Sequence, residues 1–391
     1  MKSWFFITLL LSLIISRLVW VSLNTDWTLP DINKLAKKYQ TSQYCLHGLR
    51  EQFALDRLLP EFAQFCGDGQ SFGGNIDDPE LYILAGSQYL QGASPASINW
   101  ELQPLTKYLF GAVQAFGLSP LIIQWLMFFA LLLTLYLFGR RLGMSQELSL
   151  IAPTILAFDG LVFEQLTRAL LDLTQTTLIT LFLYLLARAL KQNKSFIFSS
   201  SVIIALVALS KTFSIGILLA IVGMTATWVF SRQNIINYLQ ALTLSLVVYL
   251  LGYSFFFISH GIFNLDFLTL HTTILKFYKS YIPEYPLGEI WRVLVFGSWR
   301  AWWGDKGFLP VSEWSIFWPL GLLSSLSLFK KIKHNPFFFV LLFWTFSYLV
   351  FTSLRLVFPR YIIPVLPMLY LAFVFFGNSA LQKLGKKLSL S

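Results

Sequence analysis

The sequence predicts an all-α polytopic membrane protein with about ten transmembrane helices. Of its 391 residues, 56% are hydrophobic and only 12% are charged, whereas about 25% of the residues in a soluble domain are charged. Apolar stretches recur along the chain at lengths close to the roughly 20 residues that a helix needs to cross a bilayer. The same composition excludes a disordered chain, because disordered chains are polar and poor in aromatic residues.

Ten apolar segments account for these helices. The first, Trp4–Leu23, is followed by no small-residue cleavage site, so we interpret it as a retained span and not as a signal peptide. The other nine predicted spans are Pro120–Phe138, Leu148–Phe163, Leu173–Ala187, Phe196–Leu209, Phe213–Phe230, Tyr238–Ile258, Trp314–Phe329, Phe337–Leu354 and Tyr361–Phe376.

The basic residues predict that both termini lie in the cytoplasm. With the N-terminus inside, 13 bases and only one acid, Glu147, fall in the cytoplasmic connections. An excess of Lys and Arg in short loops beside spans marks the cytoplasmic side, and it explains the net charge of +10 without a nucleic-acid partner. Residues 1–391 are then one membrane domain with two large external loops, residues 24–119 and residues 259–312.

The first external loop contains a further apolar segment, Leu102–Gly117. Counting it as a span would reverse the side of every later charge, so we expect an amphipathic helix that lies in the outer membrane interface. Cys45 and Cys66 are in the same loop. Their spacing fits either a disulfide or two free thiols.

The densest acidic cluster of the first loop is Asp77-Asp78-Pro79-Glu80. It precedes a helix predicted over Leu81–Leu90. Two interpretations fit Asp78: it caps this helix, with Pro79 at the first helical position, or it is a general base that removes a proton from an acceptor hydroxyl or amine. Spacing alone does not rank Asp77, Asp78 and Glu80 for the second role.

Several further charged residues belong to the predicted spans or their ends. A charge in a membrane is costly unless it pairs or functions, although a helix end is also polar simply where it meets water and headgroups. Most of these residues share one side, facing the two large loops. They are Arg17, Asp159, Glu164, Arg168, Asp172, Lys211, Glu313, Arg355 and Arg360.

Five short motifs occur in order along the chain. They are Asp78-Pro79-Glu80-Leu81-Tyr82, Tyr89-Leu90-Gln91-Gly92, Gln103-Pro104-Leu105-Thr106-Lys107, Thr167-Arg168-Ala169-Leu170-Leu171-Asp172 and Arg360–Pro367. They resemble, in the same order, the Asp-Glu-x-x-Tyr, Tyr-x-x-Gly, His-Pro-Pro-Leu-Gly-Lys, Ser-Arg-x-x-Leu-Leu-Asp and Arg-Tyr-Leu-Leu-Pro-x-x-Pro motifs of the GT-C superfamily of polyprenyl-phosphate-sugar glycosyltransferases. The chain is similar in particular to the branch of protein O-mannosyltransferases and lipid A aminoarabinose transferases.

The resemblance implies a GT-C-like fold and transfer of a sugar at the external membrane face. The donor would be a polyprenyl phosphate sugar of the dolichyl or undecaprenyl type, and the acceptor a protein, a lipid or a glycan. Asp78 would be the general base, with Asp77 and Glu80 as alternatives, and the sugar would be transferred with inversion.

The resemblance also implies which residues bind the donor. Arg168 matches the motif Arg, and a guanidinium can hold a phosphate with two N–H groups. Lys107, Lys211 and Arg360 are further candidates for the phosphate. The alternatives are an ion pair between Arg168 and Asp172, four residues later, and a Lys107 that reaches the lipid headgroups. Substrate contacts are expected from Tyr82, Glu101, Gln103 and Asp172.

The second external loop is rich in aromatic and basic residues. Trp and Tyr gather at membrane interfaces for purely physical reasons. The alternative is a lid that stacks on sugars and binds headgroups. His271, in this loop, is a candidate for contact with the acceptor or the phosphate.

Two other functions stay open. A flippase or transporter of a lipid-linked solute would place charges and broken helices near the bilayer midplane, whereas these charges gather at one face. An inactive GT-C-like scaffold subunit is suggested by Pro79, because the family motif has Glu there. No Cys/His metal spacing is present, but the acidic cluster leaves a divalent cation open. We expect a bacterial inner membrane, with the ER membrane as the alternative.

Overall fold

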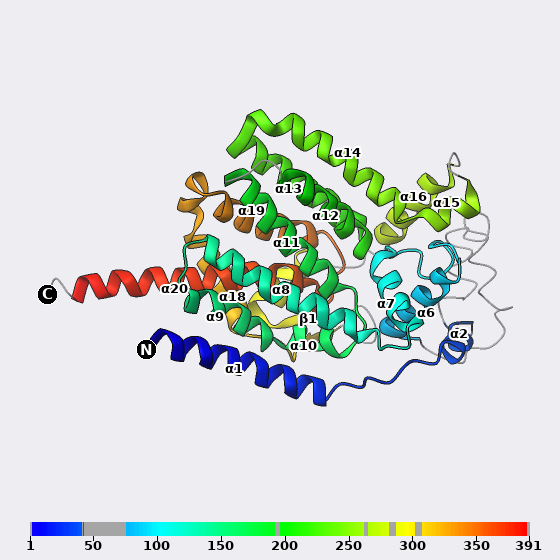
Figure 1. The fold of residues 1–391 in the computed structure, drawn as a ribbon, viewed down its shortest axis with the longest axis horizontal. Helices are drawn as coiled ribbons and strands as arrows, with labels where there is room; N and C mark the ends of the chain where they lie inside the picture. Colours follow the sequence, from blue (N-terminus) through cyan, green and yellow to red (C-terminus); the bar gives the residue numbers. More distant parts are fainter. Residues whose placement is uncertain are drawn as a thin grey trace.

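Helices form nearly all of the structure, a computed structural model that describes residues 2–40, 42, 76–191, 196–261, 265–280, 287–301 and 307–388. Both termini lie at one end of the molecule (Figure 1). Three helices of the first predicted loop lie at the other end: α2 (Ile32–Gln40), α6 (Asp78–Leu90) and α7 (Leu105–Ala115). The predicted topology requires this separation. Cys45 and Cys66 fall outside the described residues.

Each of the ten predicted spans contains a helix. These helices are α1 (Lys2–Leu23), α8 (Leu121–Arg141), α9 (Gln146–Ala157), α11 (Asp172–Lys191), α12 (Phe196–Ser210), α13 (Phe213–Ser231), α14 (Ile235–Leu251), α18 (Phe317–Ser327), α19 (Pro336–Ser353) and α20 (Leu366–Leu388). Shorter helices connect them: α10 (Gly160–Thr167), α15 (Ser254–His260), α16 (Asp266–Ser280), α17 (Glu289–Phe296), η2 (Arg232–Asn234), η3 (Phe329–His334) and η4 (Pro359–Val365).

Among the described residues, 6 helical segments are long and apolar enough to cross a membrane, or 7 if α9 and α10 count as one bent span. One of the six is the 39-residue stretch Phe213–Leu251, which is a hairpin of two helices. Ser231 leaves helical geometry, and Tyr238 Oη donates to the Ala220 carbonyl at 3.2 Å. A straight helix would separate these two residues by about 27 Å. α13 and α14 therefore run antiparallel, as two separate spans require.

Three of the predicted spans differ from the helices that form. In Leu148–Phe163 the chain bends by 65° between α9 and α10, because the Asp159 carboxylate accepts the N–H groups of Leu161 and Val162 and starts a new helix. In Tyr238–Ile258 the helix ends at Leu251 and α15 follows. Helix α18 is about 16 Å long, too short to cross a core of about 30 Å alone. The number of crossings, about ten, therefore stays a prediction.

Helix α11 lies in the middle of the bundle and packs against α8, α12, α19 and η4. Its buried side chains are unusually polar for a span: Thr174, Gln175, Thr176, Thr177 and Thr180 are each at most 2% exposed. Lipid tails offer no hydrogen bonds, so polar side chains must face the inside of the bundle. Helix α1 is the opposite case, with only 22% of its apolar window buried, and its outer surface is left to lipid.

Helices α6 and α7 form a layer at the end opposite the termini, and they cross with their backbones in contact. A Cβ atom added at Gly86 would overlap the Lys107 carbonyl, and one added at Gly111 would overlap the Gly86 carbonyl. The α7 layer rests on the end of α12, because Thr106 Oγ1 donates to the Ser210 carbonyl at 2.9 Å. The segment Leu102–Gly117 therefore contains a helix of 11 residues and not a span, as predicted.

A short hairpin of two strands follows α17 in the second predicted loop. Strand β1 (Ser298–Arg300) pairs antiparallel with β2 (Phe308–Pro310), and Trp299 lies opposite Leu309. Trp299 is 8% exposed and joins the core of the bundle. This part of the loop therefore packs onto the helices.

Candidate functional site

The acidic cluster forms the first turn of α6. Asp77 is its N-cap: Asp77 Oδ1 accepts the Glu80 N–H at 3.2 Å, and Glu80 Oε2 accepts the Asp77 N–H at 3.2 Å. This reciprocal capping box starts the helix at Asp78 and not at Leu81, so the interpretation of Asp78 as the cap is wrong. Pro79 is tolerated because N–H groups in a first turn have no helical partner.

A chain of ion pairs joins Asp78 to two other helix ends. Arg360 in η4 donates to Asp78 Oδ2, and its Nε lies 3.7 Å from Asp172 Oδ2 at the start of α11. Lys211, between α12 and α13, donates to Asp172 Oδ1. The side chains of Asp172 and Lys211 are 3% and 8% exposed, but that of Asp78 is 32% exposed. Asp78 is thus the exposed end of this chain of ion pairs, and its Oδ1 has no hydrogen-bond partner among the described residues.

Arg168 lies beside this chain and holds two other acids. Its Nη2 donates to Asp77 Oδ2 and its Nη1 to Glu164 Oε1, each at 3.0 Å. The alternative pair with Asp172 is wrong, because Arg168 has an extended backbone after α10 and Asp172 begins the next helix. Arg168 keeps 42% of its side chain exposed.

Glu80, the third acid of the cluster, is occupied on a different side. Its Oε2 accepts a hydrogen bond from Lys38 in α2 as well as the Asp77 N–H. Both ends of the first turn of α6 are therefore fixed, by Lys38 through Glu80 and by Arg168 through Asp77. Of the three predicted carboxylates, Asp78 is the one that neither caps the helix nor fixes it to α2.

Lys107 is fully buried between α7 and the loop before it. Its Nζ donates to the carbonyls of Asn99 and Leu102, each at 2.6 Å, so its amine does not reach lipid headgroups. Burial lowers the pKa of Lys107 to about 7, and burial raises the pKa of the nearby Glu101 carboxyl. In this conformation Lys107 holds the loop, and its amine is closed to a phosphate.

Gln103 and His271, far apart in the sequence, meet through Tyr249. Tyr249 Oη lies 2.8 Å from Gln103 Oε1 and 2.7 Å from His271 Nε2. His271 Nδ1 lies 2.9 Å from the Phe267 carbonyl, and burial lowers the pKa of the ring. Tyr249 Oη and Tyr253 Oη both donate to Gln103 Oε1, at 2.8 Å and 2.6 Å. Gln103 is 0% exposed, so it holds these two tyrosines in place and is not open to a substrate in this conformation.

Two further predicted residues, Tyr82 and Asp159, are buried. Tyr82 is 3% exposed and lies within electrostatic range of Arg360. Asp159 is 4% exposed, and its Oδ2 accepts hydrogen bonds from Trp318 Nε1 and Tyr370 Oη while its Oδ1 caps α10. Four donors therefore satisfy this carboxylate, which identifies Asp159 as a structural cap at the bend.

Sequence reasoning missed several residues that complete the site. Lys38 had no motif to mark it. Tyr249 and Tyr253 were hidden in a predicted span, although two Tyr residues four apart in an apolar helix were a usable signal. Tyr278, whose Oη donates to the Glu101 carbonyl at 3.2 Å, lies in the aromatic second loop, and no motif includes it. The second loop thus supplies His271 and Tyr278 to the site, while Trp302 and Trp303 fall outside the described residues.

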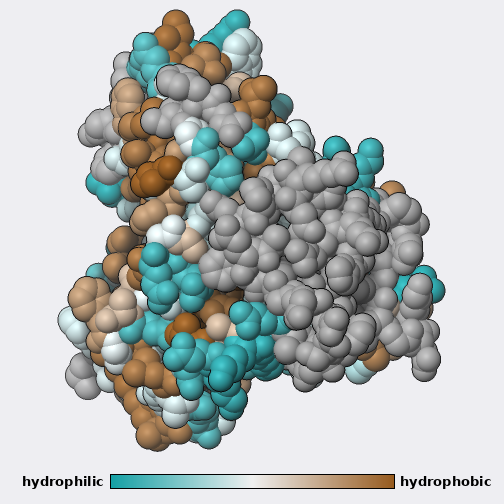
Figure 2. Space-filling view, turned by 90° about the vertical axis from the view of Figure 1, so that its right-hand side faces the viewer, coloured by the Kyte–Doolittle hydropathy of each residue, from teal (hydrophilic) through white to brown (hydrophobic). Residues whose placement is uncertain are grey.

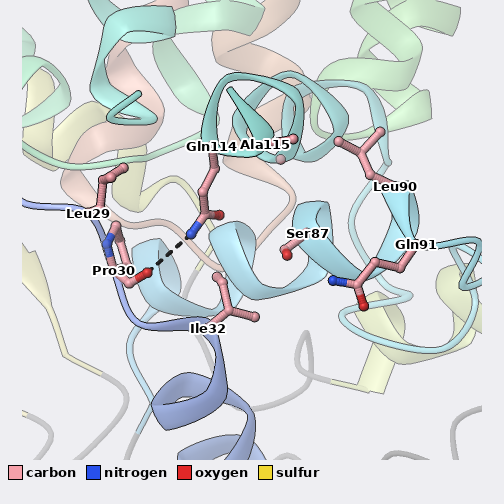
Figure 3. Close-up of a pocket in the computed structure, with 9 residues that line it drawn as sticks. Leu29, Pro30, Ile32, Ser87, Leu90, Gln91, Gln114 and Ala115 are labelled. Atoms are coloured by element: carbon pink, nitrogen blue, oxygen red, sulfur yellow. Dashed lines mark hydrogen bonds between the residues drawn. The ribbon is translucent and has the colours of Figure 1, made fainter. Parts of the chain in front are cut away.

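A separate cavity of about 440 Å³ lies between α6, α7 and the segment that follows α1 (Figure 3). Gln114 closes one side by donating to the Pro30 carbonyl at 3.2 Å. Ser87 is nine residues after Asp78, about 13 Å along α6, so this cavity is distinct from the ion pairs. Its lining is neutral: Leu29, Pro30, Ile32, Ser87, Leu90, Gln91, Gly111, Gln114 and Ala115.

Part of the described surface at the end opposite the termini is polar around a hollow. Figure 2, which faces this end, shows hydrophilic residues gathered around a depression with hydrophobic residues at its floor. Among the described residues, no group of three or more His, Cys, Asp and Glu side chains is arranged to hold a metal ion. The described residues do provide a partly exposed carboxylate, Asp78, next to the ion-paired cations Arg360 and Lys211. This arrangement is suited to proton removal and to binding an anion.

Comparisons with known proteins give a fold but no sequence family. No family model matches the sequence, and no curated protein matches it significantly. The structure is similar to a crystal structure of ArnT from Cupriavidus metallidurans bound to undecaprenyl phosphate, with a TM-score of 0.54 and 16% identity over 77% of this chain and 55% of that chain. The apo state of that protein gives a TM-score of 0.48 and 16% identity, over 84% and 59%.

The chain thus spans 55% of the length of the ArnT chain that it matches. At 16% identity the likeness shows the fold alone. The fold is all-α, with several helices long and apolar enough to cross a membrane, and it confirms the all-α polytopic membrane fold that the composition predicts.

Proposed function

We propose that the chain is a membrane glycosyltransferase that uses a polyprenyl phosphate sugar as donor. The observation that carries the proposal is Asp78: a partly exposed carboxylate at the external end, held by Arg360 and backed by the buried pair of Asp172 and Lys211. The fold shared with ArnT, whose crystal structure contains undecaprenyl phosphate, supports this class of donor. The acceptor is a protein, a lipid or a glycan, and the bacterial inner membrane is the expected location.

Asp78 is the proposed general base. A general base must have an oxygen within hydrogen-bond reach of the proton that it removes. Both oxygens of Asp77 are used, one in the cap and one by Arg168, and Glu80 is held by Lys38. Asp78 gives one oxygen to Arg360 and keeps the other available, which favours it over its two neighbours.

In the proposed reaction, Asp78 takes the proton of an acceptor hydroxyl or amine. The acceptor atom forms a bond to the anomeric carbon, and the bond from that carbon to the phosphate oxygen breaks. Its electron pair leaves with the polyprenyl phosphate, so the sugar is inverted. Fixed cations aimed at the departing phosphate lower the barrier. Among the cations that the motifs indicate, Arg168 has a half-exposed side chain, so it is the proposed first contact of the donor phosphate as the lipid arrives. The transferase is proposed to be mannosyltransferase-like.

One observation, the break between two helices at Asp159, favours the transporter alternative. A transporter would use such a break to bind its solute. However, Asp159 is fully occupied by its four donors, so it offers nothing to a solute. An inactive scaffold would have the same fold as the proposed enzyme and would differ from it only in transferring no sugar.

The test is release of polyprenyl phosphate by the purified chain in lipid nanodiscs, with a panel of polyprenyl phosphate sugars and membrane extract as acceptor. We expect Asp78→Asn to lower the rate by about 100-fold or more, the usual range for a lost general base. Asp77→Asn and Glu80→Gln, which alter the same helix turn, are the matched controls and should retain most of the activity. If Asp78→Asn is as active as these controls, the base assignment is wrong. Donor binding without turnover by the wild type would support the scaffold, and no binding would support the transporter.

A further inference from the structure

Arg355 is a cation at the external end that no motif identifies. It follows α19, where the chain turns toward η4. Its Nη2 donates to Ser214 Oγ at 3.2 Å, and its guanidinium carbon lies 4.0 Å from the centre of the Phe351 ring. Among the described residues, no carboxylate lies within ion-pair distance of Arg355. The described contacts of this group are therefore a hydroxyl and two aromatic rings, those of Phe351 and Tyr278, and they include no acid.

The other cations of the site are differently placed. Lys211 holds Asp172, Arg168 holds Asp77 and Glu164, and Arg360 holds Asp78 and Asp172, while Lys107 is closed by two carbonyls. A phosphate bound to any of the three ion-paired cations would lie beside a carboxylate of the same charge. Arg355 has no such competitor among the described residues, and a guanidinium has five N–H donors, of which the hydrogen bond to Ser214 uses one.

Arg355 belongs to the same neighbourhood as Asp78. Tyr278 and Tyr361 both lie within electrostatic range of Arg355 and of Asp78, and the Tyr361 ring also lies 4.4 Å from Lys211 Nζ. Its hydrogen-bond partner Ser214 is in the first turn of α13, whose N-cap residue makes no side-chain cap. The N–H groups of that turn add positive potential on the Arg355 side of the site.

We infer that Arg355, held by Ser214, is the main phosphate-binding cation of this site. Its ligand is the phosphate of a polyprenyl lipid, as a diester in the donor and as a monoester in the product. Aromatic rings fix the plane of the guanidinium, which leaves its remaining N–H groups to hold two phosphate oxygens at once. This inference rests on the proposed function, because it names the residue that recognises the charged part of the donor.

The test compares binding of undecaprenyl phosphate with binding of undecaprenol, which lacks the phosphate, to the full chain in phosphatidylcholine nanodiscs. We expect Arg355→Gln to weaken binding of undecaprenyl phosphate by about tenfold or more, as for a lost hydrogen bond between charged groups, and to leave binding of undecaprenol unchanged. Arg292→Gln is the matched control, because Arg292 is a half-exposed arginine of the second predicted loop whose Nε lies 3.8 Å from Glu289 Oε1. Arg355→Lys, which keeps the charge, should recover part of the loss.

The outcomes separate this inference from the proposed function. If Arg355→Gln weakens both lipids equally, or neither, Arg355 is a structural residue and the inference is overturned. If phosphatidylglycerol competes as well as undecaprenyl phosphate does, Arg355 binds membrane phosphates in general and the polyprenyl assignment is overturned. If the wild type itself binds undecaprenyl phosphate no better than undecaprenol, the proposed function fails together with the inference.

Discussion

The buried ion pair of Asp172 and Lys211 should make Asp172→Asn strongly destabilising. The two side chains are 3% and 8% exposed, and the Asp172 carboxylate also lies 3.7 Å from Arg360. Removing one partner of a buried pair costs about 3–5 kcal/mol, because the other charge stays buried without compensation. With an unfolding entropy of about 2.1 cal/mol/K per residue, this loss lowers the melting temperature of a chain of this length by roughly 4 to 6 °C.

The assay is thermal unfolding of the purified protein in nanodiscs, followed by tryptophan fluorescence. Glu164→Gln is the matched control, since it breaks a more exposed pair with Arg168 that is worth about 0–1 kcal/mol. The double variant Asp172→Asn/Lys211→Met should recover much of the loss, because it leaves no unpaired ammonium. The reasoning is refuted if Asp172→Asn melts within about 1 °C of Glu164→Gln, or if the losses of the two single variants simply add in the double variant.

Three further results are expected from other parts of the structure. Burial holds the pKa of Lys107 at about 7, below the 10.5 of an ordinary lysine. Between these two pH values the unfolded chain binds the proton more tightly than the folded chain does, so the stability of the fold should rise with pH. Melting temperatures measured over this pH range should rise less steeply for Lys107→Met than for the wild type. Gly111→Ala should prevent stable folding because its Cβ would overlap the Gly86 backbone, whereas Gly377→Ala, which meets open space, should express and melt like the wild type. Asp77→Ala should cost about 1 kcal/mol through the lost cap, and hydrogen exchange should rise in the first turn of α6; unchanged exchange would contradict the capping box.

The sequence determined the helices well because the signal for a span is local. A run of apolar residues is enough to locate α8, α11 or α19, and Arg140 and Arg141 in the last turn of α8 predict which of its ends faces the cytoplasm. The bend at Asp159 was not predictable in this way. In a uniformly apolar segment, one Asp followed by Gly carries little sign of whether the helix continues, and the bend depends on Trp318 and Tyr370 from distant helices.

The motifs indicate several residues that lie close together in the structure, but they do not indicate which of these residues pair. The motifs indicated Asp78, Arg168, Asp172 and Arg360, but the spacing of four residues suggested a pair between Arg168 and Asp172 that does not form. The pair of this spacing that forms joins Arg168 to Glu164, four residues before it. Two other pairs join residues 91 and 282 positions apart, Arg168 with Asp77 and Arg360 with Asp78. Such pairing follows from how the helices pack, which a single sequence does not encode in any short pattern.

The most direct measurement for the whole account is a time course of both products in one reaction. Wild-type protein in nanodiscs receives a polyprenyl phosphate sugar labelled in the sugar, with membrane extract as acceptor. The account predicts that polyprenyl phosphate and labelled acceptor appear together in equal amounts, and that both vanish for Asp78→Asn while donor binding persists. Donor that is bound but never consumed would contradict it.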